Sequence, residues 1–152
     1  WFVAPLMSSL VGSTIDTFLF FFISENYAQI ITKSEVFDDG GLKSITYFEK
    51  IDNKFVVVKE EQFFDDGSLW YICELKRIFD KKDLKYIKIK DGKFSSYHSN
   101  GRKKEEGFYN EDKKDGKWIN WYGNGYKMSE EIYKDGLKIS KKSWNEDGSV
   151  KD

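Results

Sequence analysis

Hydrophobic and polar residues are distributed differently in two parts of the chain. The first 24 residues are almost entirely apolar or small, and Asp16 is their only ionisable side chain. From residue 25 onward, short segments rich in Trp, Tyr, Phe, Ile and Val are separated by Asp-Gly and Asn-Gly pairs. Such pairs supply the positive φ of tight hairpin turns, and aromatic and β-branched residues favour strands. The pattern therefore predicts an apolar helix over residues 1–24, followed by β-hairpins.

Eight glycines preceded by Asp or Asn mark the predicted turns. They are Gly40, Gly67, Gly92, Gly101, Gly116, Gly125, Gly136 and Gly148. A shift of 24 residues superimposes 91–110 on 115–134, and a further shift of 23 places Trp121 on Trp144. A looser match at a shift of 27 relates 36–45 to 63–72. The chain therefore divides into an apolar segment (1–24), degenerate hairpin repeats (25–90) and well-formed hairpin repeats (91–152).

The spacing of the turns indicates the fold class. Gly92 and Gly101, like Gly116 and Gly125, are nine residues apart. This step leaves about six residues of strand after a short turn, which is a common strand length. Repeated hairpins of this kind build an all-β, elongated, single-layer antiparallel array in which each unit packs against its neighbours. Such a sheet encloses little core, so we expect aromatic side chains to cover one face and Lys and Glu to solvate the other.

Composition disfavours several classes of function. The 152 residues include 25 Lys and Arg against 26 Asp and Glu, with one Cys and one His. A single Cys excludes an intrachain disulfide, and one His with one Cys excludes a His/Cys metal cage within the chain. The balanced charge provides little field to attract nucleic acid. We therefore predict neither an enzyme nor a nucleic-acid-binding protein, and no metal or cofactor.

Motifs that could carry chemistry have structural explanations here. Pairs of carboxylates such as Asp38-Asp39 precede glycines at predicted turns, where Asp bonds to the backbone. The segment 110–116 resembles a calcium loop only in outline, because Lys113 occupies a position that needs an oxygen ligand. His98 is interpreted as a cross-strand surface residue and Cys73 as a small buried group. No catalytic residue is predicted.

Six aromatic side chains are the candidate binding residues. They are Tyr97, Trp118, Trp121, Tyr122, Tyr133 and Trp144. In one interpretation they pack across strands and hold the sheet together. In the other, part of the set is an exposed face that binds a partner, since Trp and Tyr are enriched in binding hot spots. Both interpretations hold if the two groups lie on opposite faces.

The apolar segment 1–24 also has two interpretations. Its length suits a helix that crosses the hydrocarbon core of a membrane, which needs about 20 residues. A carboxylate such as Asp16 within a span is typical of a helix packed in a bundle. The Ser and Thr residues of the segment suit a helix packed on the sheet instead. Membrane association is the favoured prediction, and a signal peptide is disfavoured because a basic start and a small-residue cleavage site are missing.

The segment 1–23 carries the elements W-x-x-A-P, S-x-x-G and D-T, followed by an aromatic run. They fall at Trp1, Ala4, Pro5, Ser9, Gly12, Asp16, Thr17 and residues 20–23. This pattern resembles one membrane helix of the bacterial queuosine-precursor transporters. The resemblance implies a borrowed or fused transporter-like stretch, although a single helix cannot form a transport path.

A second pattern, D-G-K-W-I-N-W-Y-x-N-G-x-x-x-x-E-x-x-Y-x-D-G, runs from Asp115 to Gly136. It resembles the bacterial variant of the MORN repeat (membrane occupation and recognition nexus). The likeness is strong over about residues 91–148 and weaker over 35–90. The resemblance implies an antiparallel β-hairpin array used for interaction. Proteins built of this variant are often catalogued as YwqK-type antitoxins of toxin–antitoxin systems.

These patterns together predict a non-enzymatic interaction module that binds a protein partner. An antitoxin-like role is what the second resemblance implies. One alternative is a membrane component related to the queuosine-precursor transporters through residues 1–24. Another is a lipid-contacting module, which the name of the repeat suggests.

Overall fold

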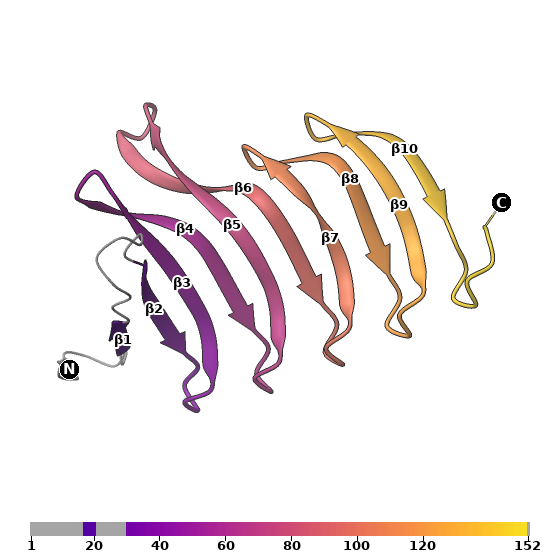
Figure 1. Ribbon diagram of the computed structural model, residues 1–152, viewed down its shortest axis with the longest axis horizontal. Coiled ribbons are helices and arrows are strands. Elements are labelled where there is room, and N and C mark those ends of the chain that lie inside the picture. The colour runs from indigo at the N-terminus through magenta and orange to yellow at the C-terminus, as the bar shows by residue number, and fades with distance from the viewer. Residues whose placement is uncertain (1–16, 21–29, 152) are drawn as a thin grey trace.

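The computed structural model describes residues 17–20 and 30–151, and these form a single antiparallel sheet (Figure 1). Ten strands follow one another in chain order without a crossover. The predicted all-β array of antiparallel hairpins is confirmed. The strands are β1 (Thr17–Phe20), β2 (Ile30–Val36), β3 (Leu42–Ile51), β4 (Lys54–Phe63), β5 (Leu69–Asp80), β6 (Lys85–Tyr97), β7 (Lys103–Asn110), β8 (Lys113–Trp121), β9 (Lys127–Lys134) and β10 (Leu137–Ser143).

The predicted helix over residues 1–24 is wrong for the four residues of that segment that the structure describes. Thr17–Phe20 form the strand β1, which pairs with β2 from Thr17 opposite Ser34 to Phe20 opposite Ile31. A β-branched residue and two aromatic residues in four positions favour a strand. The remainder of the predicted helix, 1–16 and 21–24, lies outside the described residues. In the described part of the chain, no helix has the length and apolarity that crossing a membrane requires.

Five turns, all at the same end of the strands, share one geometry. In each, the N–H of the first residue donates to the carbonyl of the fifth, and the glycine N–H donates back to the first carbonyl, as in Tyr122 to Tyr126 and Gly125 to Tyr122, both 2.9 Å. Gly125 has a φ of 96°, which a residue with a side chain rarely adopts. This is the type I turn with a glycine bulge that three-residue hairpin loops favour. The five turns are 37–41, 64–68, 98–102, 122–126 and 145–149.

The turns at the opposite end of the strands have a different geometry. Asp52 and Asn53 both have positive φ, as do Glu111 and Asp112, and then Asp135 and Gly136. Two consecutive residues with positive φ form the type I′ turn, whose twist matches that of the strands beside it. The link between β5 and β6 is longer and occupies residues 81–84.

Gly92 and Gly116 do not lie at turns, contrary to the sequence prediction. Gly92 lies inside β6 and Gly116 inside β8, where the pairing with the preceding strand is irregular. Such bulges bend a strand and increase its twist. β6 and β8 therefore have 13 and 9 residues instead of the expected six. The other six glycines named above do lie in turns, each with positive φ.

Asparagine side chains connect the last three of the five glycine-bulge turns. Asn100 Oδ1 accepts the N–H of Arg102 within its own turn, while its Nδ2 donates 2.8 Å to the carbonyl of Gly123 in the next. Asn124 repeats this arrangement, with Nδ2 2.8 Å from the carbonyl of Glu146. Asp147 occupies the same position in the last turn, where its carboxylate accepts from Ser149. The two turns 98–102 and 122–126 are thus each linked to the next turn by an asparagine amide, whereas Asp39 and Asp66, at the same position of the first two turns, bond within their own turns.

We expect Asn124→Asp to destabilise the protein by about 1 kcal/mol, because the variant keeps the bond within the turn but loses the donor to the Glu146 carbonyl. Urea unfolding followed by circular dichroism measures the change. Asp147→Asn is the matched control, since no bond to a further turn is at stake, and its effect should be smaller. Equal losses in the two variants would show that the link between turns contributes nothing.

Candidate interaction surface

One of the two faces of the sheet carries a continuous row of aromatic rings, which we call the aromatic ladder. It consists of Tyr71, Phe94, Tyr109, Trp118 and Tyr133. Ring centroids lie 5.5 Å apart between Phe94 and Tyr109, 4.9 Å between Tyr109 and Trp118, and 6.4 Å between Trp118 and Tyr133. Offset and edge-to-face contacts at these distances stabilise beyond the area they bury. We call this side of the sheet the ladder face.

Trp118 is the centre of the ladder and is completely buried, although the sheet has one layer. Its indole lies over Gly107 of β7, where no side chain separates the ring from the backbone. The indole Nε1 donates 3.1 Å to the carbonyl of Phe108, which satisfies its one polar group. Phe94 and Cys73 complete the buried cluster around it. The small core of the protein therefore lies on this face.

Three lysines spaced 24 residues apart cover the ladder. Lys90 lies 4.9 Å from the ring centroid of Tyr109, Lys114 lies 3.9 Å from that of Trp118, and Lys138 lies 6.0 Å from that of Tyr133. An ammonium group over an aromatic face is attracted by the ring quadrupole, and the lysine stem buries apolar surface. Burial raises the pKa of Tyr133 to about 12, and its hydrogen bond to a carboxylate adds to the effect. The ladder face is thus closed by the protein's own side chains.

The carboxylate bound to Tyr133 is that of Glu131, which is itself largely buried on this face. The Tyr133 hydroxyl donates 2.7 Å to Glu131, and Lys138 and Lys141 lie 3.3 and 3.6 Å from it. Burial alone would raise the pKa of Glu131, but the hydrogen bonds from Tyr133 and Lys138 outweigh it and hold the pKa below the ordinary 4.5. The ionised form of Glu131 therefore belongs to the folded state.

This shift predicts a pH dependence of stability. Because the folded pKa lies below the unfolded one, the contribution of Glu131 is complete above about pH 5 and is lost as the pH falls through the folded pKa. We expect the free energy of unfolding to decrease on acidification below pH 4.5. Glu131→Gln should reduce this decrease, because Gln accepts the Tyr133 bond without titrating. Urea midpoints at pH 7 and at low pH measure the effect; an identical pH profile in the variant would contradict it.

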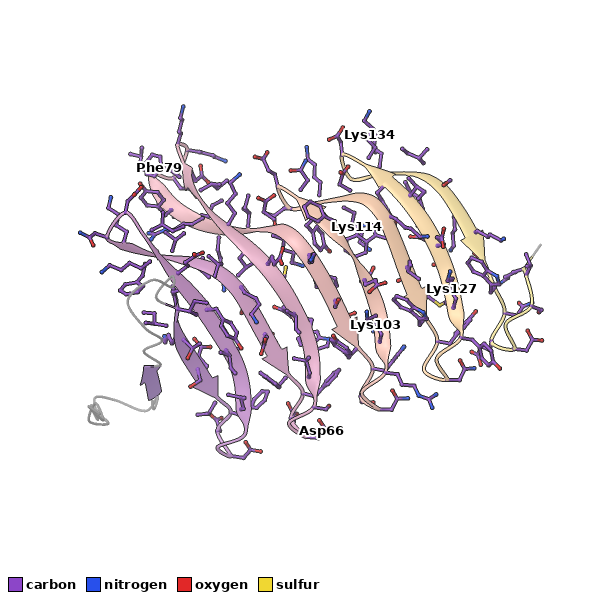
Figure 2. All side chains as sticks on the ribbon, in the orientation of Figure 1. Asp66, Phe79, Lys103, Lys114, Lys127 and Lys134 are labelled. Carbon is purple, nitrogen blue, oxygen red and sulfur yellow. The ribbon has the colours of Figure 1, made fainter. Side chains whose placement is uncertain are left out.

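The second face, which we call the open face, carries a different aromatic series. Strand alternation places Tyr97 and Trp121 on it, since Phe94 and Trp118, three residues earlier in each strand, point to the ladder face. Lys103 lies 5.6 Å from the ring centroid of Trp121. Trp144 follows the same scheme, with Lys127 at 5.0 Å. All three aromatic side chains are half-buried and lie two strands apart (Figure 2 labels Lys103 and Lys127).

Charges of both signs surround these rings. Lys103 pairs with Glu106, and Lys127 pairs with Glu130 at 3.2 Å, so each lysine has a carboxylate three residues further on. An exposed apolar residue follows each pair on the same strand: Phe108 on β7 is 45% exposed and Ile132 on β9 is 36% exposed. The open face therefore presents apolar rings within a nearly neutral polar surround.

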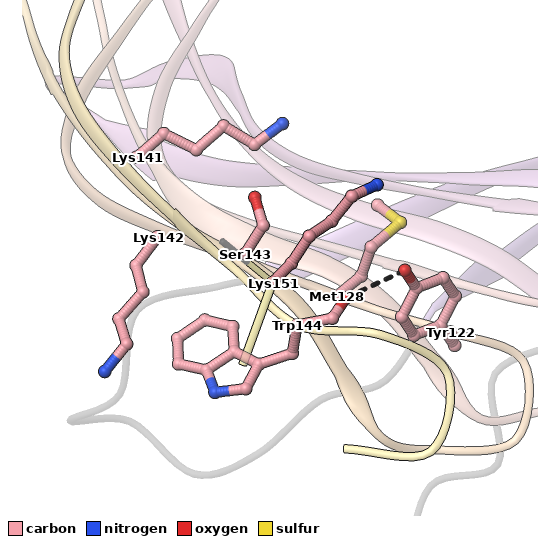
Figure 3. Close-up of a pocket in the computed structure, with 7 residues that line it drawn as sticks. All are labelled: Tyr122, Met128, Lys141, Lys142, Ser143, Trp144 and Lys151. Atoms are coloured by element: carbon pink, nitrogen blue, oxygen red, sulfur yellow. Dashed lines mark hydrogen bonds between the residues drawn. The ribbon is translucent and has the colours of Figure 1, made fainter. Parts of the chain in front are cut away.

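Tyr122 belongs to neither series, because it is the first residue of the turn 122–126. Its hydroxyl donates 2.9 Å to the carbonyl of Trp144, as the dashed line in Figure 3 shows. The two residues border a shallow hollow of about 620 Å³ at the C-terminal edge of the sheet. Its other lining residues are Met128, Lys141, Lys142, Ser143 and Lys151.

The six predicted binding residues thus divide into two groups. Trp118 and Tyr133 lie in the aromatic ladder, whereas Tyr97, Trp121 and Trp144 lie on or beside the open face. Tyr122 lies apart from both, in the turn 122–126. Trp118 and Tyr133 therefore pack across strands, as the first interpretation has it, whereas the binding interpretation concerns the other four residues. Gly107 and the lysines of the ladder were not singled out from the sequence, although the spacing of 24 residues between those lysines is visible there.

The other residues considered from the sequence have structural partners. His98 Nε2 lies 2.9 Å from the carbonyl of Trp121, which ties one turn to the next hairpin. Cys73 is completely buried, as predicted, and burial raises the pKa of its thiol to about 11. Among residues 17–20 and 30–151, no group of three or more His, Cys, Asp or Glu side chains is placed to hold a metal ion.

Comparison of the chain with protein-family models, with curated proteins and with solved structures finds no match.

Proposed function

We propose that the protein is a non-enzymatic interaction module that binds a protein partner through the open face. The observation that carries this proposal is the series Tyr97, Trp121 and Trp144, which are half-exposed and lie at the end of β6, at the end of β8 and directly after β10. Neighbouring strands lie about 4.8 Å apart, so anchors on alternate strands recur about every 10 Å. Such a spacing offers a partner a regular row of contact points.

The chemistry of the open face supports a protein as the partner. Tyr and Trp are the residues most enriched among binding hot spots, where they bury large rigid surfaces. Lys103 and Lys127 are already paired with Glu106 and Glu130, so little positive charge remains for phosphate groups. The ladder face makes the weaker candidate, because its central rings are already buried: Trp118 is 0% and Phe94 9% exposed.

The resemblance of residues 35–148 to the bacterial MORN-repeat variant agrees with this role. In that case the array is a scaffold whose repeats share one partner, and a toxin protein is the first partner class to test. A lipid-contacting role is the competing proposal, and flotation of the full chain with lipid vesicles distinguishes it from protein binding.

The test compares the protein with its double variant Trp121→Ala/Trp144→Ala. Partners are first captured from native cells on the immobilised protein at micromolar concentration and identified, and their affinities are then measured by calorimetry. We expect the double variant to lose at least about tenfold in affinity, as is typical when hot-spot aromatics are truncated. Phe79→Ala is the matched control, since Phe79 is 47% exposed at the other end of β5 and strand alternation places it on the side of Tyr71, away from the open face. No specific partner, or equal losses in the two variants, would contradict the proposal.

A further inference from the structure

The C-terminal edge of the sheet is formed by β10, whose outer side carries no strand among the described residues. β10 is the last strand in the sheet order, and its inner side pairs with β9 (Figure 1). The chain after it turns back only at its end, where the Lys151 N–H donates 3.0 Å to the Ser143 carbonyl and Trp144 bridges to Val150. The outward main-chain donors and acceptors of residues 137–142 have no partner among the described residues.

The outward direction of these groups follows from the pairing. The Trp144 N–H donates to the Met128 carbonyl of β9, while the Ser143 carbonyl points outward to Lys151. Because successive residues of a strand alternate, the N–H and carbonyl of Lys141 also point outward. An extended chain laid along this edge would find hydrogen-bonding partners already in place.

The edge is basic. β10 contains Lys138, Lys141 and Lys142 and no acidic residue. Lys138 and Lys141 share the carboxylate of Glu131, whereas Lys142 and Lys151 form no ion pair with any described residue. Lys141, Lys142 and Lys151 all line the hollow of Figure 3, together with apolar atoms of Met128, Trp144 and Tyr122.

The sheet itself shows which strand suits such an edge. On the inner side, Lys141 lies opposite Glu131 and Lys142 opposite Glu130, so adjacent carboxylates on β9 are in register with adjacent lysines on β10. Lys141 pairs with Glu131 at 3.6 Å, whereas Glu130 pairs with Lys117 and Lys127. A second copy of β10 would instead bring lysines against lysines, which is unfavourable across strands. Charge complementarity therefore selects an acidic strand over a second copy of β10.

We propose that the outer edge of β10 binds an extended acidic segment of a partner protein by strand addition. Adjacent carboxylates of that segment meet Lys141 on the ladder face and Lys142 on the open face, and a neighbouring apolar side chain enters the hollow beside Trp144. This inference rests on the proposed function in that the partner is a protein, but the binding mode does not require Trp121.

The test uses the full chain, labelled with ¹⁵N, and blocked peptides of about ten residues, long enough to cover the edge. In one peptide Val and Thr flank a central Glu-Glu pair; in the matched peptide the central pair is Lys-Lys. We expect saturable binding of the acidic peptide alone, weakened by salt. Amide hydrogen exchange at Lys141 should slow in the complex.

Lys141→Glu/Lys142→Glu should lower the affinity for the acidic peptide at least about tenfold. Lys81→Glu/Lys82→Glu makes the same charge change in the exposed turn 81–84 and should leave the affinity within about twofold, since separated surface charges are screened. Trp121→Ala should also leave it unchanged. Failure of the edge with retained partner binding by the open face would refute this inference and spare the proposed function.

Three results would overturn strand addition at β10. The first is no saturable binding of the acidic peptide. The second is binding without slowed exchange at Lys141, which would indicate side-chain attraction alone. The third is a dimer in sedimentation velocity whose formation excludes the peptide, which would make a second copy the occupant of the edge.

Discussion

Replacement of Trp118 by Ala is expected to destabilise the sheet by about 3–5 kcal/mol, the range for truncating a buried aromatic residue. Trp118 is 0% exposed and contacts the rings of Phe94, Tyr109 and Tyr133. The truncation removes those contacts and the cover over Gly107, and a one-layer sheet has no second layer that can move in. Domains of this size are stable by only about 5–15 kcal/mol. Urea unfolding followed by far-ultraviolet circular dichroism measures the loss.

Trp70→Ala is the matched control for this prediction, because it truncates the same side chain where 43% of it is exposed. We expect a loss of about 1 kcal/mol or less there, consistent with the smaller area removed from water. Trp118→Phe should fall between the two, since a smaller ring still fills part of the site. If Trp118→Ala cost no more than Trp70→Ala, the aromatic ladder would not be the core of the protein.

Turn chemistry made much of the fold predictable, and the same chemistry explains where the prediction failed. Asp-Gly and Asn-Gly indicate positive φ wherever it is needed, at a turn or at a bulge inside a strand. Asp91 and Asp115 precede the bulge glycines, and their carboxylates accept the N–H groups of Glu111 and Asp135, at 3.2 and 3.4 Å, in the turn of the next hairpin. That partner is distant in sequence, so a local pattern cannot distinguish the two cases.

The division of the aromatic residues was partly readable from the sequence. Phe94 and Tyr97 are three residues apart, as are Trp118 and Trp121. An odd separation within one strand places two side chains on opposite faces. Which face is closed depends on long side chains from neighbouring strands. Lys114 of β8 covers the rings of Trp118 and Tyr133, and only the three-dimensional register shows this.

The closed ladder and the open face have complementary roles in the proposed function. Anchors on alternate strands keep a fixed spacing only if the strands between them do not flex. The ladder connects β5, β6, β7, β8 and β9 through ring contacts, from Tyr71 to Tyr133. Rigidity on one face therefore preorganises the other, which lowers the entropy cost of binding.

Gly107→Ala tests the closest approach in the ladder and is expected to cost about 1–3 kcal/mol, the typical penalty of overpacking. A Cβ at Gly107 would lie 2.7 Å from Cγ of Trp118 and nearer still to two other ring atoms. The ring cannot retreat, because Phe94, Tyr109 and Tyr133 surround it and its Nε1 is bound to the Phe108 carbonyl.

Gly123→Ala provides the matched control for the Gly107 substitution. A Cβ at Gly123 would meet only Asn100 Nδ2, at 3.9 Å, and the backbone there does not have positive φ. Alanine should be close to neutral or slightly stabilising at this position, because it restricts the unfolded chain. Urea midpoints measure both variants. A Gly107→Ala protein as stable as Gly123→Ala would mean that Trp118 does not lie on the β7 backbone, and the account of how one layer buries a tryptophan would fail with it.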